Sequence, residues 1–137
     1  LLASSAASDV YKRQEQYLDE GLVSARTLTD YLFDRMEAHD LRRADVVRAS
    51  GLNATVVYDI FSGKSRPGRD HAIMLAFGLK CTLRETQRLL RLAGVSELWC
   101  KQRRDAIIIW CIRNGFDRIA TDDELYRMGE ATLLPAD

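Results

Sequence analysis

Apolar residues recur at spacings of three and four along most of the chain, which places them on one face of an α-helix. Glycines or polar capping residues separate the stretches that follow this pattern. The pattern predicts helices over residues 27–38, 42–50, 53–61, 70–79, 82–93 and 97–114, and a last helix that opens at residue 121. No stretch shows the sustained alternation of apolar and polar residues that indicates a half-buried strand. We therefore expect an all-α protein.

The predicted helix ends carry the residue types that begin and end helices. Gly51 follows the second predicted helix, at the position where a left-handed residue closes the last turn. Two capping boxes, a Thr with a Glu three positions later, occur at Thr82–Glu85 and at Thr121–Glu124. We expect the first box to open the fifth helix and the second box to open the last one.

Length and composition limit the fold further. The chain has 137 residues, enough for one domain with a core, and its two prolines and eight glycines favour helices over a turn-rich β fold. Its formal net charge is zero, so the chain as a whole carries no basic signal for nucleic acid. Residues 40–80, however, hold seven Lys and Arg against four acidic residues, a net charge of +3. Any argument for nucleic-acid binding must therefore rest on this segment.

Several classes of site find no support in the residue pattern. The three cysteines lack CxxC spacing and have no histidine in a zinc-like pattern, so we expect reduced thiols, a cytoplasmic protein and no bound metal. The longest apolar run, residues 106–112, is far below the ~18 residues that span a bilayer. No motif provides a nucleophile with a base and an oxyanion donor, and none forms a phosphate-binding loop. We expect neither an enzyme nor a cofactor.

The first 14 residues differ from the rest of the chain. They are small and polar, show no sustained periodicity, and lack the basic start and long apolar centre of a signal peptide. The stretch SSAASDVYKRQ, residues 4–14, resembles the conceptual translation of a transposase adapter used in sequencing libraries. We interpret residues 1–14 as non-native, disordered sequence, with a natural disordered tail as the alternative, and expect the natural start to be missing. Residues 15–23 form a lead-in to the first domain.

Residues 41–67 have the spacing of two short helices that share one small core. Val46 and Val47 face inward from the first of these helices, and Gly51 provides the tight turn. Val57 and Ile60 then fix the second helix. This arrangement leaves the second helix with an outward face that can enter a nucleic-acid groove.

The segment DLRRADVVRASGLNATVVYDIFSGKSRP, residues 40–67, resembles without a gap the helix-turn-helix of Cro/repressor-type (xenobiotic-response-element-like) transcription regulators. Its Ser-Gly-Lys-x-x-Pro loop stands in register with the family pattern. The similarity covers about residues 27–92, nearly half of the chain. It implies a lambda-repressor-like, five-helix DNA-binding domain, which we place at residues 24–93, followed by a C-terminal helical extension at 94–137.

In this family the second helix of the pair lies in the major groove. The resemblance implies that Asn53 reads adenine and that Thr55 contacts a thymine methyl or a phosphate. Arg43 would contact a phosphate or a guanine, and the basic residues in and after the loop would hold the DNA backbone. The implied DNA-binding set is Arg42, Arg43, Asn53, Ala54, Thr55, Tyr58, Asp59, Lys64, Arg66 and Arg69.

Some residues depart from the family pattern. The groove helix has no Arg or Lys between Asn53 and Phe61, and Asp59 would face phosphates or accept only from cytosine. Val47 stands where a small alanine is usual. The leading hypothesis is a sequence-specific transcription regulator, a repressor of bacterial or phage origin that binds duplex DNA as a homodimer. The alternative is a degenerate helix-turn-helix domain that acts as a protein–protein interaction adaptor.

The C-terminal segment resembles, more weakly, the extension of a subset of these regulators from Gram-positive bacteria. It carries more apolar residues than one exposed helix can, so we expect it to pack on the core, on a second protomer or on both. We expect Trp99 and Trp110 in this core, with an interface contact as the alternative for Trp99. Arg103, Arg104 and Asp105 are expected on a solvated face. A protein partner for the C-terminal helices is a further alternative.

Overall fold

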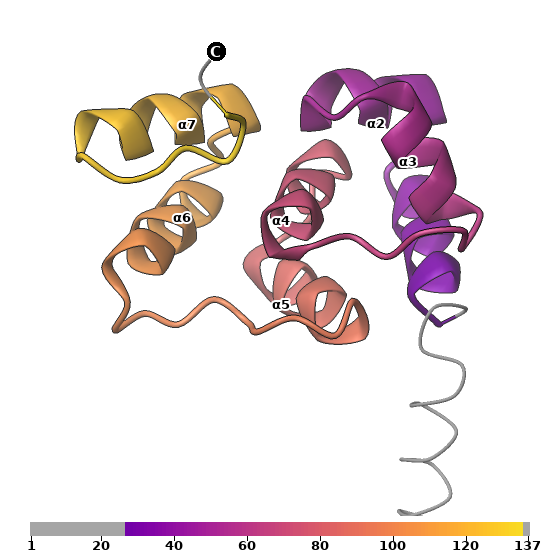
Figure 1. The fold of residues 1–137 in the computed structure, drawn as a ribbon, viewed down its shortest axis with the longest axis horizontal. Coiled ribbons are helices and arrows are strands. Elements are labelled where there is room, and N and C mark those ends of the chain that lie inside the picture. Colours follow the sequence, from indigo (N-terminus) through magenta and orange to yellow (C-terminus); the bar gives the residue numbers. More distant parts are fainter. Residues whose placement is uncertain (1–26, 136–137) are drawn as a thin grey trace, which may run out of the picture.

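The computed structural model describes residues 27–135 of the chain (Figure 1). A first helix covers residues 27–38. It is followed by α2 (Arg43–Ser50), α3 (Ala54–Phe61), α4 (Arg69–Gly78), α5 (Leu83–Leu92), α6 (Arg103–Arg113) and α7 (Arg118–Arg127). No strand occurs in residues 27–135, so the prediction of an all-α protein is confirmed for this part of the chain. The segments predicted at 1–14 and 15–23, and the expected domain start at 24, lie outside the described residues.

Helix α4 occupies the centre of the fold. In Figure 1, α2 and α3 lie on one side of it and α6 and α7 on the other, and α4 contacts α2, α5 and α7. Five consecutive residues of α4, 72–76, are buried. A helix that is apolar on every side is stable only when neighbours cover every side. The helices before and after α4 therefore both contribute to its burial.

One hydrophobic core runs through the whole described chain. Leu28 and Leu32 of the first helix belong to it, together with Val57 and Ile60 of α3. The C-terminal extension adds buried side chains to the same core, namely Leu98, Ile108, Ile109, Leu125 and Leu133. The extension therefore packs on the core, as its apolar content required.

Two crossed ion pairs join the first turn of α4 to the first turn of α6. The Arg69 guanidinium donates to both carboxylate oxygens of Asp105 at 3.0 and 2.6 Å. Arg104 donates in return to both carboxylate oxygens of Asp70 at 2.9 and 3.1 Å. Asp105 is buried and also accepts from the backbone N–H of Trp99 at 3.0 Å. These contacts tie the extension to the core with defined geometry, because bidentate Arg–carboxylate pairs fix orientation as well as distance.

This network corrects two expectations drawn from the sequence. Arg69, expected on the DNA backbone, instead binds Asp105 and the carbonyl oxygens of Ser96 and Glu97. Arg104 and Asp105, expected on a solvated face, have side chains that are only 14% and 5% exposed. The partners lie 34 and 36 positions apart, which a reading of local pattern does not reveal.

Two predicted helix starts are also wrong. Helix α6 begins at Arg103 rather than at residue 97, because the Gln102 side chain caps it by accepting from the backbone N–H of Asp105 at 2.8 Å. Helix α7 begins at Arg118 rather than at Thr121. The Asp117 carboxylate caps it by accepting from the backbone N–H of Ala120 at 2.8 Å, and Thr121 is buried within the helix.

The two tryptophans lie at the surface, contrary to the expectation of core positions. Trp99 is 61% exposed and Trp110 is 51% exposed. Helix α6 buries Ile108 and Cys111, and Trp110 points away from that side to pack edge-on against Phe116, with ring centroids 5.2 Å apart. Trp99 precedes the helix in an irregular segment.

Gly51 is the point where the extension touches the turn between α2 and α3. It adopts a left-handed φ of 79° and closes α2, as the sequence predicts. A Cβ atom at this position would lie 2.6 Å from Nε of Arg118. Arg118 is buried and donates to Asp122 at 2.7 Å, and Asp122 accepts from the backbone N–H of Leu133. Glycine is therefore needed here both for the backbone and for the close approach of Arg118.

The first prediction separates these two requirements. Gly129 has a similar φ of 75°, and a Cβ there would meet nothing within 4 Å. Gly129→Ala should lower the free energy of unfolding by about 1–2 kcal/mol, the cost of a left-handed backbone alone. Gly51→Ala should cost clearly more, because Arg118 must also move. Urea denaturation of both variants measures the difference, and equal losses would contradict the contact with Arg118.

The second prediction concerns the buried carboxylate. Asp105→Ala leaves the Arg69 guanidinium without its main partner, so we expect a loss of about 3 kcal/mol in the free energy of unfolding. Asp123→Ala, at an exposed position of α7, should change stability by less than about 0.5 kcal/mol. Chemical denaturation compares the two. A loss below about 1 kcal/mol for Asp105→Ala would mean that the pair contributes no more than an exposed one.

Candidate nucleic-acid interface

The turn between α2 and α3 is three residues long and is held by local hydrogen bonds. The backbone N–H of Gly51 donates to the carbonyl of Val47 at 3.2 Å. The Ser50 hydroxyl accepts from the backbone N–H of Leu52 at 3.2 Å, and both of these residues are buried. The inward Leu52 anchors the turn to the core. A short turn with internal hydrogen bonds therefore fixes the two helices relative to each other.

Helix α3 divides into a buried face and an open face. Val57, Ile60 and Phe61 are buried, as the hydrophobic pattern predicts. The other side of the helix and the residue before it present Asn53, Ala54, Thr55 and Tyr58, all exposed. Asp59 is half-buried. The structure thus brings the predicted groove-facing residues of α3 together on one surface.

Asn53 caps helix α3. Its side-chain oxygen accepts from the backbone N–H of Thr55 at 2.8 Å. Asparagine is among the best N-cap residues because its side chain satisfies an N–H that the helix leaves unpaired. The cap therefore accounts for asparagine at this position without any DNA, while the amide nitrogen keeps its donors for another partner.

Arg43 and Tyr58 link the start of α2 to the middle of α3. The guanidinium carbon of Arg43 lies 5.1 Å from the centroid of the Tyr58 ring, within the range of a cation–π contact. The Tyr58 residue is 44% exposed, so this stacked pair stands at the surface. The contact holds a positive charge directly beside the open face of α3.

The charge on α2 is only partly available. Asp45 accepts from the backbone N–H of Arg42 at 3.0 Å and forms ion pairs with the side chains of Arg42 and Arg48. The hydrogen bond from the Arg42 backbone lowers the pKa of Asp45 below its usual value, and the two guanidinium charges lower it further. Asp45 is therefore ionised at neutral pH and offsets part of the positive charge.

The loop after α3 folds back on the helix. The backbone N–H groups of Lys64 and Ser65 donate to the carbonyl of Asp59 at 2.9 and 3.2 Å. Lys64 and Arg66 have exposed side chains, while Pro67 between the loop and α4 is buried. The backbone of Asp59 therefore orders the loop that carries these two cations.

Eight of the ten predicted DNA-binding residues are exposed on or next to the α2–α3 unit, and two are not. The exposed ones are Arg42, Arg43, Asn53, Ala54, Thr55, Tyr58, Lys64 and Arg66. Asp59 is half-buried, and Arg69 is engaged with the extension. Arg48, absent from the predicted set, is a further exposed cation of α2, and it pairs with Asp45. In the sequence, Arg48 can be recognised as a basic residue in the last turn of the predicted helix.

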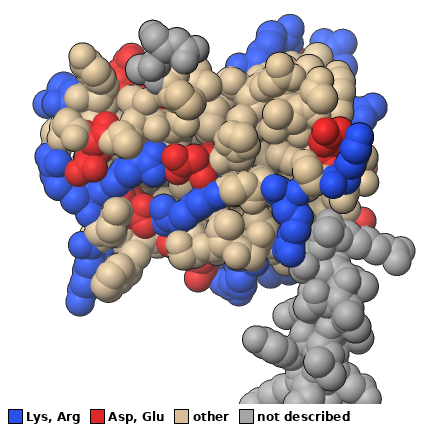
Figure 2. Space-filling model, in the orientation of Figure 1, with Lys and Arg blue, Asp and Glu red and all other residues tan. Residues whose placement is uncertain are grey.

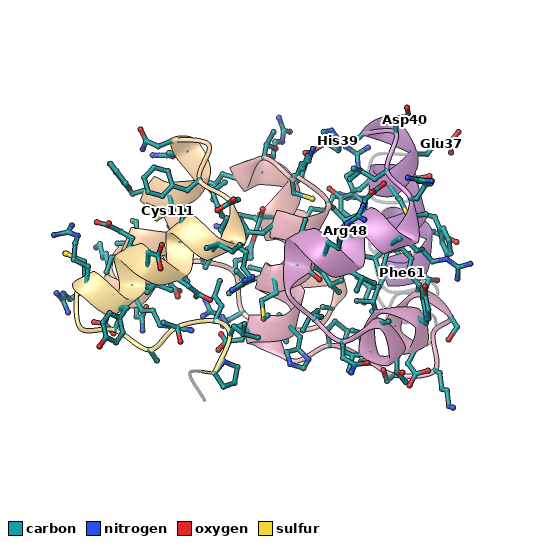
Figure 3. The ribbon with its side chains drawn as sticks, turned by 90° about the horizontal axis from the view of Figure 1, so that it is seen from above. Glu37, His39, Asp40, Arg48, Phe61 and Cys111 are labelled. Carbon is teal, nitrogen blue, oxygen red and sulfur yellow. The ribbon has the colours of Figure 1, made fainter. Side chains whose placement is uncertain are left out.

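The arrangement of charge follows the fold. Figure 2 shows Lys and Arg side chains gathered at the upper right, over α2, and a mixture of both signs over α6 and α7. Figure 3 shows Phe61 of α3 and Cys111 of α6 in opposite halves of the molecule, with Arg48 of α2 between them. The candidate interface therefore lies on the α2–α3 half of the molecule, and the α6–α7 turn reaches only the last turn of α2 and the Gly51 turn.

Among residues 27–135, no three His, Cys, Asp or Glu side chains come together in a way that could hold a metal ion. No helix in this range is long and apolar enough to cross a membrane. Comparisons with protein-family models, with curated proteins and with solved structures give no match.

The third prediction tests the cap. Asn53→Ala removes the acceptor for the Thr55 N–H and should lower the free energy of unfolding by about 1 kcal/mol. Asn53→Ser restores a capping oxygen and should stay within about 0.5 kcal/mol of the parent. Thr55→Ala serves as the matched control at the neighbouring exposed position. Thermal and urea unfolding measure all three, and a serine variant as unstable as the alanine variant would contradict the capping role.

Proposed function

We propose that α2, the turn and α3 form a helix-turn-helix of the Cro/repressor type that binds duplex DNA. The chain would then be a cytoplasmic, sequence-specific transcription regulator, a repressor, with a lambda-repressor-like DNA-binding domain. One observation carries the proposal: packing leaves the Asn53–Tyr58 side of α3 open, with the exposed cations Arg42 and Arg43 beside it. A helix that reads a major groove needs this combination of an open face and flanking phosphate contacts.

The proposal divides the work between two sets of residues. Arg42, Arg43, Lys64 and Arg66 contact phosphates and fix the register on the duplex. Asn53 and Thr55, at the start of α3, reach base edges. Arg69 has no part in this interface, because its guanidinium is held by Asp105.

Electrostatics make phosphate contacts the main source of affinity. Helix α3 carries no cation, and Asp59 is acidic. Four phosphate contacts per protomer give a slope of log K against log salt of about −3.6, from about −0.9 per contact. Affinity should therefore fall steeply with salt.

The extension supports a homodimer. Trp99, Trp110 and Tyr126 are large aromatic residues on it, and each is more than half exposed. Exposed aromatic side chains are enriched where proteins associate. Two protomers joined through the C-terminal helices could read half-sites about one helical turn of DNA apart, roughly 34 Å. Alternatively, a different protein binds these helices.

The rival function is a protein-interaction adaptor that keeps the fold without reading DNA. Two observations favour it: Asp45 offsets the charge of α2, and Tyr58 gives the open face of α3 an exposed aromatic side chain. An adaptor would bind a protein through this same face and would show no salt-dependent affinity for DNA.

The fourth prediction separates these functions. Fluorescence anisotropy with a random-sequence duplex, at a series of salt concentrations, should show binding that weakens steeply as salt rises. Arg43→Ala, Lys64→Ala and Arg66→Ala each remove one phosphate contact per protomer, so each should make the salt slope shallower by about 0.9 per bound protomer, or about 1.8 for a homodimer. Lys101→Ala removes an exposed cation of the extension and should leave the slope unchanged.

Base reading is tested in the same system. Asn53→Ser, which retains the cap, should leave the salt slope unchanged while altering the base preference found by selection from a random-sequence pool. Absence of binding to any duplex at ~50 mM salt, where non-specific binding is strong, would overturn the proposal and favour the adaptor.

A further inference from the structure

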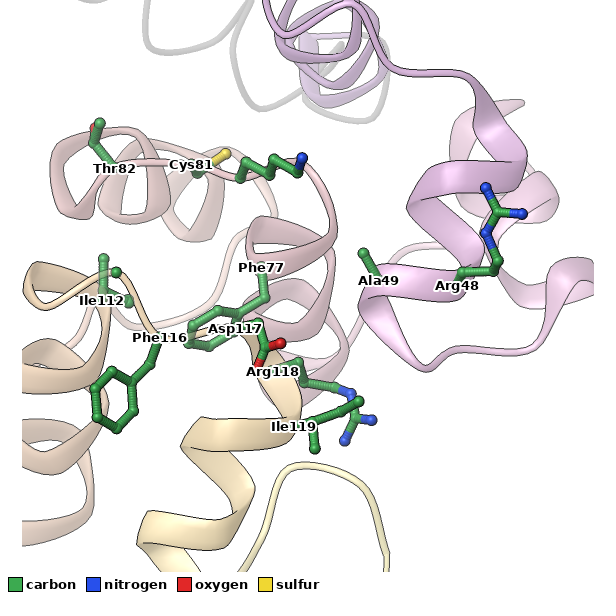
Figure 4. Close-up of a pocket in the computed structure, with 12 residues that line it drawn as sticks. Arg48, Ala49, Phe77, Cys81, Thr82, Ile112, Phe116, Asp117, Arg118 and Ile119 are labelled. Carbon is green, nitrogen blue, oxygen red and sulfur yellow. The ribbon is translucent and has the colours of Figure 1, made fainter.

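A pocket of about 480 Å³ lies between the end of α2, the end of α4 and the turn from α6 to α7 (Figure 4). Volumes of about 300–1,000 Å³ are typical of small-molecule sites. Ala49 of α2 stands on one side of the pocket, and Phe77, Ile112 and Phe116 stand on the other. The pocket is distinct from the open face of α3, because none of Asn53, Ala54, Thr55 or Tyr58 lines it.

The walls of the pocket are mainly apolar. Phe77 of α4 and Phe116 of the α6–α7 turn contribute aromatic rings, and Ile112 and Ile119 contribute branched aliphatic side chains. Ile119 is 60% exposed and lies towards the opening. Walls of this kind favour a flat, apolar body in the occupant.

The charged residues around the pocket are mostly cationic. Arg48, Lys80 and Arg118 line it, against Asp117 as the one acid in the lining. Asp45 pairs with Arg48, and Asp122 pairs with Arg118. Asp117 caps α7. None of the ion pairs formed among residues 27–135 involves Lys80, so its charge remains for an occupant.

The left-handed backbone of Lys80 favours a functional role for its side chain. Lys80 closes α4 with a φ of 56°, in the left-handed region. Gly51, Gly94 and Gly115 adopt the same conformation after other helices, and Asp40 (φ 52°) is the other non-glycine residue of the described range that does so. Glycine adopts it without strain, whereas lysine does so at a cost. Strain of this kind collects at functional positions, and here it coincides with an unpaired charge at a pocket.

The neighbouring thiol adds no negative charge. Burial raises the pKa of Cys81 to about 12, so the thiol stays protonated at neutral pH. A carboxylate that enters the pocket therefore meets the Lys80 ammonium without a thiolate beside it.

We propose that this pocket binds a small aromatic carboxylate. The carboxylate pairs with the Lys80 ammonium, and the ring lies among Phe77, Ile112 and Phe116. The ligand thereby bridges α2 and the extension through contacts with Ala49 and Ile119. This proposal does not depend on DNA binding by α3, and a separate experiment tests it.

The fifth prediction uses the full chain labelled with ¹⁵N. Titration with 4-phenylbutyrate should give saturable amide shifts at Ala49, Lys80, Ile112 and Ile119, with a dissociation constant of about 1 mM or below. The uncharged isostere 4-phenylbutyramide should bind at least tenfold more weakly, because it cannot pair with Lys80. Residues of the α3 open face should show no shift.

Two variants test the assignment within the pocket. Lys80→Gly relieves the left-handed backbone, so it should raise the melting temperature while weakening 4-phenylbutyrate at least fivefold. Ala49→Trp places a large side chain in the pocket and should abolish binding. Lys101→Ala, on an exposed loop outside the pocket, should bind like the parent.

Three outcomes would overturn the proposal. They are absence of saturable shifts with 4-phenylbutyrate, equal affinity for the acid and the amide, and unchanged affinity in Lys80→Gly. Shifts confined to residues outside the pocket count as the first of these.

Discussion

The burial of α4 on every side is the constraint on which the rest of the structure depends. Its residues 72–76 have no face that tolerates water, so α2, α5 and α7 must all be in place. The polar residues of its first turn also hold the extension in place. Arg69 binds Asp105, and Asp70 binds Arg104. Removing the partner of a buried charge such as Asp105 costs more than the pair itself contributes. The extension is therefore a structural part of the fold and completes the core.

The same constraint fixes the candidate interface from two directions. On one side, α2 approaches α4 so closely that a Cβ at Gly78 would lie 2.9 Å from the Val46 carbonyl. On the other side, Arg118 of α7 rests against Gly51 in the turn before α3. Both contacts require a glycine, and both determine where α2 and α3 sit. The position of the open face of α3 thus depends on α4 and α7 as well as on α2.

Local patterns predicted most of the fold, and distant partners account for the errors. The Thr82–Glu85 capping box and the left-handed Gly51 depend on neighbours within a few residues, and both are present as predicted. The Thr121–Glu124 box failed because Asp117 offered a competing cap one turn earlier. Arg69 was assigned to DNA because its partner, Asp105, lies 36 positions away. For the candidate site, periodicity predicts the exposed face of α3. The cap at Asn53 and the stack of Arg43 on Tyr58 depend on the three-dimensional arrangement, which periodicity does not give.

Helix α2 connects the two candidate binding regions. Its first residues, with Arg43 stacked on Tyr58, belong to the open face of α3, and its last turn, with Arg48 and Ala49, lines the pocket. Eight residues of α-helix rise only about 12 Å, so the two regions are separated by little more than two helical turns. The Gly51 turn and the close approach at Gly78 leave it little room to shift without disturbing buried neighbours. Ala49 at the pocket and Arg43 beside the open face of α3 therefore hold fixed positions relative to each other on one short helix.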